Sequence, residues 1–215
     1  MLATDQQVSE FVKLFYDGTR LEYKKNELIV RPGEQPAGVF YIEEGLVKAY
    51  NISKYGEENL LIIRKSGDIF PLIWALTDAE RDINYQALSS IILWRIGRDQ
   101  YLEYLRSLNS SLAPLLDMVV NNYRMNSERI LNLEYRTVRE RVVSFLITMS
   151  SHFGEPIEQG ILISAPLRHQ DIASSINSSR ETASREMAYL ERKGLISTHQ
   201  SLILIKDYEK LGSYL

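Results

Sequence analysis

Residues 170–190 read QDIASSINSSRETASREMAYL, the pattern of two short amphipathic helices joined by a tight turn. Ile172, Ala173 and Ile176 form the apolar stripe of the first helix, and the small Ala173 lets a second helix approach closely. Asn177 lies at the turn, where it tolerates a left-handed backbone better than most non-glycine residues do. The stretch therefore predicts a helix-turn-helix.

The second helix of this stretch has a start signal and an inward face. Ser178, with Glu181 three residues later, fits a capping box. The inward, apolar face consists of Ala183, Met187 and Leu190. Four side chains are left facing outward, and these are Arg180, Glu181, Ser184 and Arg185.

The outward side chains have the chemistry of base recognition. In the N-terminal half of a recognition helix, Arg donates two hydrogen bonds to guanine O6 and N7, and Glu accepts one from cytosine N4. The alternative is that Glu181 is only the cap partner and that the arginines are solvated surface charges. The whole pattern, with both helix faces correct and a hairpin after them, favours DNA binding.

The hairpin is predicted from the residues around the two helices. Residues 161–163 read as a short strand before the helices, and residues 194–196 and 202–205 read as strand segments after them. His199, Gln200 and Ser201 form a polar turn between the last two segments. A strand, two helices and a hairpin make a winged helix-turn-helix, with His199 in the wing.

Residues 21–96 read as short strands separated by turn signals about every ten residues. Runs at 39–42, 46–50 and 59–63 are rich in β-branched and aromatic residues, as half-buried strands require. Turn signals occur at 32–34, at Gly45 and at 67–68. This spacing predicts an antiparallel sandwich or jelly roll.

From residue 99 onward the period becomes helical, and one stripe repeats at alternating steps of four and three residues. The stripe consists of Leu112, Leu116, Val119, Tyr123, Asn126, Ile130 and Leu133. Such a heptad seam suits pairing with an identical helix, and the single polar Asn126 favours one register. The alternative is a helix packed on its own barrel. Because Pro114 fits a first helical turn, the helix is expected to start near Ser110 or Ser111.

The composition excludes several kinds of chemistry. The 215 residues include no Cys, which excludes disulfides, thiol catalysis and iron–sulfur clusters. The three histidines, His152, His169 and His199, are never within one helical turn of each other, so no metal site is expected. The net charge of −3 leaves DNA binding open, because residues 137–215 carry 9 Lys and Arg against 9 Asp and Glu that can gather on different faces.

No targeting or membrane segment is expected. Residues 1–20 lack the apolar run and cleavage site of a signal peptide, and charges interrupt every apolar stretch well before it could cross a bilayer. The sequence therefore predicts a cytoplasmic protein without a membrane partner.

Further motifs carry a resemblance to a known family. They are PGE at 32–34, VFYIEEGLV at 39–47, GDIF at 67–70, NSE at 126–128 and SRET at 179–182 followed by Arg185. With them, nearly the whole chain resembles the cyclic-AMP receptor protein and FNR family of bacterial transcription regulators. The resemblance implies a homodimer on double-stranded DNA, with RNA polymerase as a further partner. It also implies an inverted repeat of half-sites similar to TGTGA, in which Arg180 and Arg185 read guanines and Glu181 reads the opposite cytosine.

The resemblance implies a wider set of DNA contacts around these three residues. That set consists of Arg168, His169, Gln170, Ser178, Ser179, Thr182, Ser184 and His199. Arg168 and His169 stand where relatives often have Thr and Arg, so phosphate contacts are expected to persist while the cap residue differs. Both His169 and His199 are either phosphate contacts or plain surface.

The combined expectation is an α+β protein of three parts. Residues 1–109 form a cyclic-nucleotide-binding-like jelly roll (a double-stranded β-helix) that acts as a sensor, and residues 110–136 form a dimerisation helix. Residues 137–215 form the winged helix-turn-helix domain, whose first helix runs from Val138 to about residue 151, with Phe153-Gly154 marking its end.

Cyclic-nucleotide binders of this family hold the ribose and phosphate with a Gly-Glu pair, an Arg and a small hydroxyl residue. Here Pro71 and Leu72 stand in place of Gly and Glu, and Asp82 replaces the hydroxyl residue after Arg81. Pro71 has no N–H to offer a phosphate, and Asp82 repels one. We therefore expect no control by cyclic AMP, and no cofactor.

The candidate effector-pocket residues are Leu72, Trp74, Arg81, Tyr85, Asn126 and Ser127. Their apolar and aromatic members suit a small-molecule effector of unknown identity, or they are simply core. A second possibility is a purely structural barrel in a regulator that needs no effector. A cupin-like jelly-roll enzyme is disfavoured, and haem ligation by the barrel is excluded, because residues 21–96 contain no His. The protein is not expected to be an enzyme.

Overall fold

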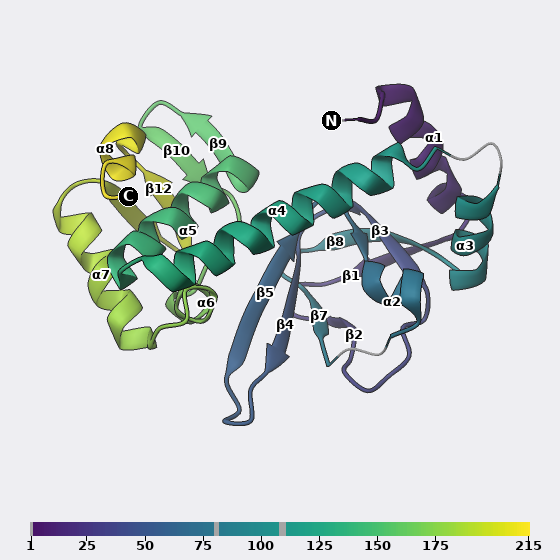
Figure 1. Cartoon of the computed structure of the whole chain (residues 1–215), viewed down its shortest axis with the longest axis horizontal. Coiled ribbons are helices and arrows are strands. Elements are labelled where there is room, and N and C mark those ends of the chain that lie inside the picture. Colours follow the sequence, from purple (N-terminus) through teal and green to yellow (C-terminus); the bar gives the residue numbers. More distant parts are fainter. Residues whose placement is uncertain (1, 80–81, 108–110) are drawn as a thin grey trace. The chain divides into compact units, whose positions relative to one another are not determined.

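The computed structural model describes residues 2–79, 82–107 and 111–215 (Figure 1). The chain forms two compact units, one of Met1–Ile52 with Leu61–Arg124 and one of Ser53–Leu60 with Met125–Leu215. The first unit is rich in strands, and the second carries the helix-turn-helix. The α+β fold class predicted from the sequence is confirmed.

Two four-stranded sheets form the barrel, with strand orders β1-β8-β3-β6 and β2-β7-β4-β5. Their strands are β1 (Thr19–Tyr23), β2 (Leu28–Val30), β3 (Val39–Glu44), β4 (Val47–Ile52), β5 (Glu58–Arg64), β6 (Ile69–Phe70), β7 (Asn84–Ala87) and β8 (Ile91–Ile96). Most neighbours in a sheet are not consecutive in sequence, so the chain crosses repeatedly between the sheets. This is the jelly-roll topology that the spacing of turn signals predicts.

The inward side chains of the two sheets form the barrel core. The ring of Phe70 stacks on Phe40 and on Tyr85, with centroids 5.2 and 5.0 Å apart. Val47 and Leu93 are fully buried in the same cluster. Each buried side chain of this size stabilises the fold by about 1.5–3 kcal/mol.

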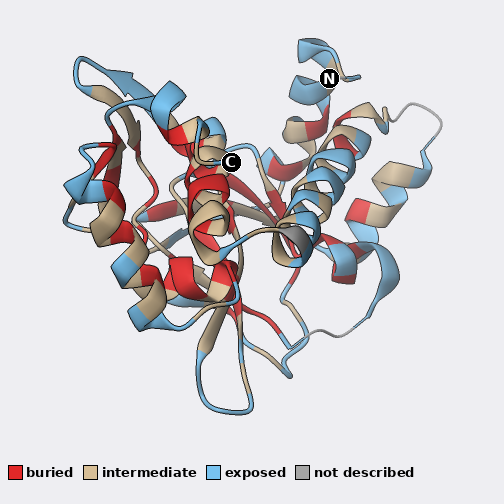
Figure 2. Cartoon of the chain, turned by 60° about the vertical axis from the view of Figure 1, so that its left-hand side comes forward, coloured by how far each residue is buried: buried red, intermediate tan, exposed pale blue. Residues whose placement is uncertain are grey.

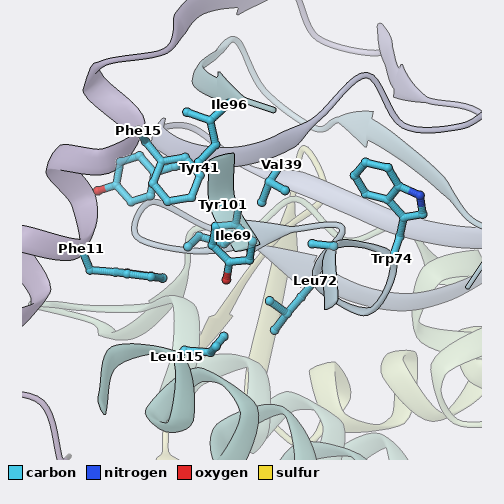
Figure 3. Close-up of a cluster of buried hydrophobic side chains, with 11 residues drawn as sticks. Phe11, Phe15, Val39, Tyr41, Ile69, Leu72, Trp74, Ile96, Tyr101 and Leu115 are labelled. Carbon is cyan, nitrogen blue, oxygen red and sulfur yellow. The ribbon is translucent and has the colours of Figure 1, made fainter. Parts of the chain in front are cut away.

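Three helices add a second cluster at one end of the barrel, drawn in Figure 3. They are α1 (Asp5–Tyr16), α2 (Leu72–Thr77) and α3 (Arg98–Arg106). Phe11 and Phe15 of α1 pack on the fully buried Tyr101 of α3. Helix α1 was not among the predicted elements, although Thr4 and Gln7 form a capping box at its start.

The long helix α4 (Ala113–Tyr135) begins later than predicted. Ser110 lies outside the described residues, and the carbonyl of Leu112 accepts the first helical hydrogen bond, from the Leu116 N–H at 2.9 Å. Leu112 therefore stands at the edge of the helix rather than inside it. Pro114 occupies the first turn, as expected, because its missing N–H would have no helical partner there.

The second unit holds the predicted winged helix-turn-helix. Its helices are α5 (Val138–Phe153), α6 (His169–Ser175), α7 (Arg180–Arg192) and α8 (Tyr208–Gly212). A sheet of order β11-β12-β10-β9 comprises β9 (Gly154–Ile157), β10 (Gly160–Ile163), β11 (Ile196–His199) and β12 (Leu202–Ile205). Strand β9 was not predicted, because Gly154 and Pro156 read as a helix stop. It pairs with β10 alone, at an edge of the sheet where a Pro is tolerated.

Buried positions recur along the helices of this unit, with partly or fully exposed positions between them (Figure 2). Helix α5 turns Val142, Val143 and Leu146 inward, each fully buried.

Within the described part of the chain, no helix is both long and apolar enough to cross a membrane.

Candidate nucleic-acid interface

The helix-turn-helix is built as the sequence predicts. Ile172 and Ala173 of α6 and Ala183 of α7 have no exposed surface. Between the helices, Asn177 adopts a φ of 50°, and the Ser178 N–H donates to the Ala173 carbonyl at 3.0 Å. The left-handed Asn177 thus reverses the chain and brings the apolar faces of α6 and α7 together.

The cap of α7 is Ser179, so the prediction of Ser178 as the cap residue is wrong. The Ser179 hydroxyl accepts from the Thr182 N–H at 3.2 Å. Ser178 instead extends the turn that follows Asn177. Either serine suits a helix cap. Because the turn takes up Ser178 as well as Asn177, the helix starts one residue later and Ser179 becomes the cap.

Three charged side chains lie exposed on the N-terminal half of α7: Arg180, Glu181 and Arg185. One Arg185 nitrogen donates to the Thr182 hydroxyl at 3.1 Å, which steadies the guanidinium along the helix. The pKa of Glu181 is lowered by its own backbone N–H, by the Ser179 hydroxyl and by the two arginines. The carboxylate is therefore ionised at neutral pH, as an acceptor for a base amino group must be.

Two residues predicted to contact DNA, Ser184 and His169, are hydrogen-bonded to each other within the helix-turn-helix. The Ser184 hydroxyl of α7 lies 2.8 Å from His169 Nδ1 of α6, so this pair ties the two helices together. Gln170, the next residue of α6, is partly exposed.

Arg168, immediately before α6, is held by two carboxylates. Its guanidinium donates to Asp171 at 3.1 Å and to Glu58 at 2.6 Å, and both raise its pKa. Asp171 also accepts from the Arg168 backbone N–H at 2.9 Å, which closes the start of α6. The sequence pattern did not indicate Glu58, which is 110 residues away.

Two contacts of Arg139 join helix α5 to α7, the second helix of the helix-turn-helix. Arg139 Nε donates to the Glu186 carboxylate of α7 at 2.7 Å. The Arg139 guanidinium also lies 3.7 Å from the ring centroid of Tyr189, in cation–π contact. These two contacts limit rotation of α7 about its axis, which would change where its outward side chains point.

The wing is the β11–β12 hairpin, with Gln200 and Ser201 in left-handed conformations at its turn. His199 is exposed at the end of β11. The Ser201 carbonyl accepts from the Leu167 N–H at 2.7 Å, which connects the wing to the segment before α6. The wing and the start of α6 are therefore held together.

The heptad seam of α4 lies exposed in the single chain. Exposed fractions are 48% for Leu116, 73% for Tyr123 and 58% for Ile130. A different face of α4 packs on the barrel cluster through Leu115 and Met118. One face of α4 therefore packs against the barrel of its own chain, and a separate apolar stripe on the same helix is exposed in the monomer.

The residues of that stripe are not equally exposed. Leu112, Val119 and Asn126 are exposed, whereas Leu133 is partly buried. Ser127, beside the stripe, is also partly buried.

A cleft of ≈ 480 Å³, part of it open solvent, lies in the barrel unit. Its lining consists of Val30, Gly33, Glu34, Pro36, Pro71, Ile73, Trp74, Ile83 and Tyr85. Trp74 and Tyr85 were predicted to line a pocket, but Leu72 packs into the hydrophobic cluster instead (Figure 3). Arg81 lies outside the described residues, and Asn126 and Ser127 belong to the other compact unit.

The lining has mainly apolar and aromatic character. Among its residues, Glu34 alone carries a charge, and that charge is negative. In the described ranges, no group of three or more His, Asp and Glu side chains is placed to hold a metal ion.

Two family models match the chain. The model described as a Crp-like helix-turn-helix domain matches residues 140–214. The model described as a cyclic nucleotide-binding domain matches residues 20–107.

Curated proteins and solved structures resemble the chain over most of its length. A global nitrogen regulator of Nostoc sp. is 28% identical over 186 residues, covering 85% of this chain and 83% of that protein. A CRP-like cAMP-activated global transcriptional regulator of Mycobacterium tuberculosis is 22% identical, covering 89% and 86%. The structure of a CooA variant from Carboxydothermus hydrogenoformans gives a TM-score of 0.78 at 20% identity, covering 98% of this chain and 96% of that one. This last likeness shows a shared fold.

Proposed function

We propose that this chain, as a member of the cyclic-AMP receptor protein and FNR family of DNA-binding transcription regulators, binds an inverted DNA repeat as a homodimer. The observation that carries the proposal is the exposed trio Arg180, Glu181 and Arg185 on the N-terminal half of α7. This is the part of a recognition helix that reaches base edges in the major groove.

Each member of the trio has a base that matches its hydrogen-bonding groups. Arg180 and Arg185 donate to guanine O6 and N7, and the ionised Glu181 accepts from cytosine N4. These assignments favour half-sites similar to TGTGA. Phosphate contacts around the groove are supplied by Gln170, Ser178, Ser179 and His199. The further partner is RNA polymerase, in the cytoplasm.

Dimerisation through α4 is supported by the exposed stripe that contains Leu116, Tyr123 and Ile130. An identical helix offers the same stripe, so a two-fold pair covers both. Two recognition helices then meet half-sites about 34 Å apart, one turn of the DNA helix.

We expect no cyclic-AMP control, although the mycobacterial relative is described as cAMP-activated. Pro71 and Leu72 stand where cyclic-nucleotide binders of the family have a Gly-Glu pair, and Pro71, which lines the barrel cleft, has no N–H to offer a phosphate. Titration calorimetry of the full-length protein with cyclic AMP should therefore detect no binding in the micromolar range. Micromolar affinity would overturn this part of the proposal.

The proposal is tested by selecting bound duplexes from random DNA with ligand-free protein. We expect an inverted repeat of TGTGA-like half-sites to be enriched without any added small molecule if the barrel is purely structural. Enrichment that needs a cell extract would instead show that the barrel requires an effector. No sequence preference under either condition would overturn the proposed function.

A further inference from the structure

Arg168 is the residue where the proposed DNA interface meets an internal ion pair. Its side chain is 54% exposed, and its guanidinium contacts Asp171 Oδ2 at 3.1 Å and Glu58 Oε2 at 2.6 Å. Both partners belong to the same compact unit as Arg168. One cation is therefore shared by two carboxylates.

Asp171 accounts for the structural part of this arrangement. Its side chain is only 7% exposed, and it accepts from the Arg168 backbone N–H at 2.9 Å as well as from the guanidinium. This pair caps α6 and is neutral by itself. Glu58 is not needed for the cap, and it leaves the three residues with a surplus negative charge on the exposed side.

Glu58 is held in this position by the residues that follow it. The Leu60 N–H donates to the Ser174 hydroxyl of α6 at 3.1 Å. Arg129 donates to the carbonyls of Leu60 and Ser174, each at 3.3 Å. Residues 53–60 are thus fastened to α6, and the Glu58 carboxylate is presented to Arg168 rather than left to move with a loose turn.

We propose that Glu58 sets the affinity for DNA by competing with a backbone phosphate for the Arg168 guanidinium. The inference rests on the proposed function, because it places the start of α6 beside the DNA backbone. The Glu58 carboxylate already accepts from Arg168 Nη2, so a phosphate oxygen drawn to the same guanidinium would lie beside it, and the two anions repel each other. Since an exposed ion pair contributes little free energy, the Glu58 carboxylate keeps the phosphate from Arg168 in only part of the bound complexes, and the effect on affinity is graded rather than all-or-none.

The test compares Glu58→Gln with Glu57→Gln in the full-length protein. Glu57 is the exposed neighbour of Glu58, and it is Glu58 that contacts Arg168. Substitution of Glu57 therefore removes the same charge but leaves the Arg168–Glu58 ion pair in place. We expect Glu58→Gln to tighten binding by about two- to fivefold per subunit on both specific and nonspecific duplexes. The salt dependence should also steepen, by up to about one ion per subunit, because Arg168 then contacts the phosphate in more of the bound complexes. Glu57→Gln should leave the salt slope unchanged.

Arg168→Gln completes the cycle while keeping a hydrogen-bond donor for Asp171. In this background, Glu58→Gln should no longer tighten binding, and thermal unfolding should confirm that both variants fold. Equal affinities of Glu58→Gln and Glu57→Gln, or a gain that persists with Arg168→Gln, would overturn the inference alone. A wild-type protein that binds no duplex would overturn the proposed function, and this inference with it.

Discussion

Leu116→Asp is expected to convert the protein into a monomer that fails to bind the inverted repeat. Leu116 is 48% exposed on the α4 stripe, and the paired helix would bury it. An uncompensated buried charge costs about 3 kcal/mol or more, and a two-fold interface contains it twice, so the dimer should weaken about 10⁴-fold. Sedimentation at micromolar concentration measures the association, and fluorescence anisotropy on a labelled palindrome measures the binding. Ile130→Asp should behave in the same way.

Leu131→Asp is the matched control for this experiment. Leu131 is 56% exposed on the same helix, but it lies one position past the stripe, about 100° around the helix from Ile130. It should remain a dimer and bind normally. If Leu116→Asp also remains dimeric, the stripe is not the interface, and the exposed apolar residues of α4 need another explanation.

The helix-turn-helix could be predicted closely because its determinants are local. The apolar spacing of Ile172, Ala173 and Ile176, and the turn at Asn177, depend on residues within one or two helical turns. The cap was misplaced by one residue for a reason that is also local. Ser178 and Ser179 have equal side chains, and only the backbone path after Asn177 selects between them.

The barrel and its cleft depend on contacts that sequence spacing does not encode. Turn signals and runs rich in β-branched and aromatic residues predicted the strands, but the short helix α2 turns Leu72 into the core and Ile73 toward the cleft. The pairing of Arg168 with Glu58 joins positions 110 residues apart, and no local pattern connects them. Such pairings follow from tertiary packing, so they became visible only in the structure.

Arg180→Ala is expected to cost about 1–3 kcal/mol of binding free energy per half-site, a loss of about 5- to 150-fold. The change should leave α7 folded, because Ala has the highest helix propensity and Arg180 is exposed at the first helical position. The loss should be confined to one guanine of each half-site. Binding to a panel of palindromes with single base-pair changes measures this, since the variant should no longer distinguish bases at that position.

Arg192→Ala provides the matched control, because Arg192 is exposed in the last turn of the same helix. It removes the same charge, but far from the residues that face the groove, so base preference should be unchanged at every position. Uniform weakening of Arg180→Ala across all sequences would assign Arg180 to a phosphate rather than a base. The recognition of TGTGA-like half-sites would then rest on Glu181 and Arg185 alone, and a double substitution of those two should abolish all sequence preference.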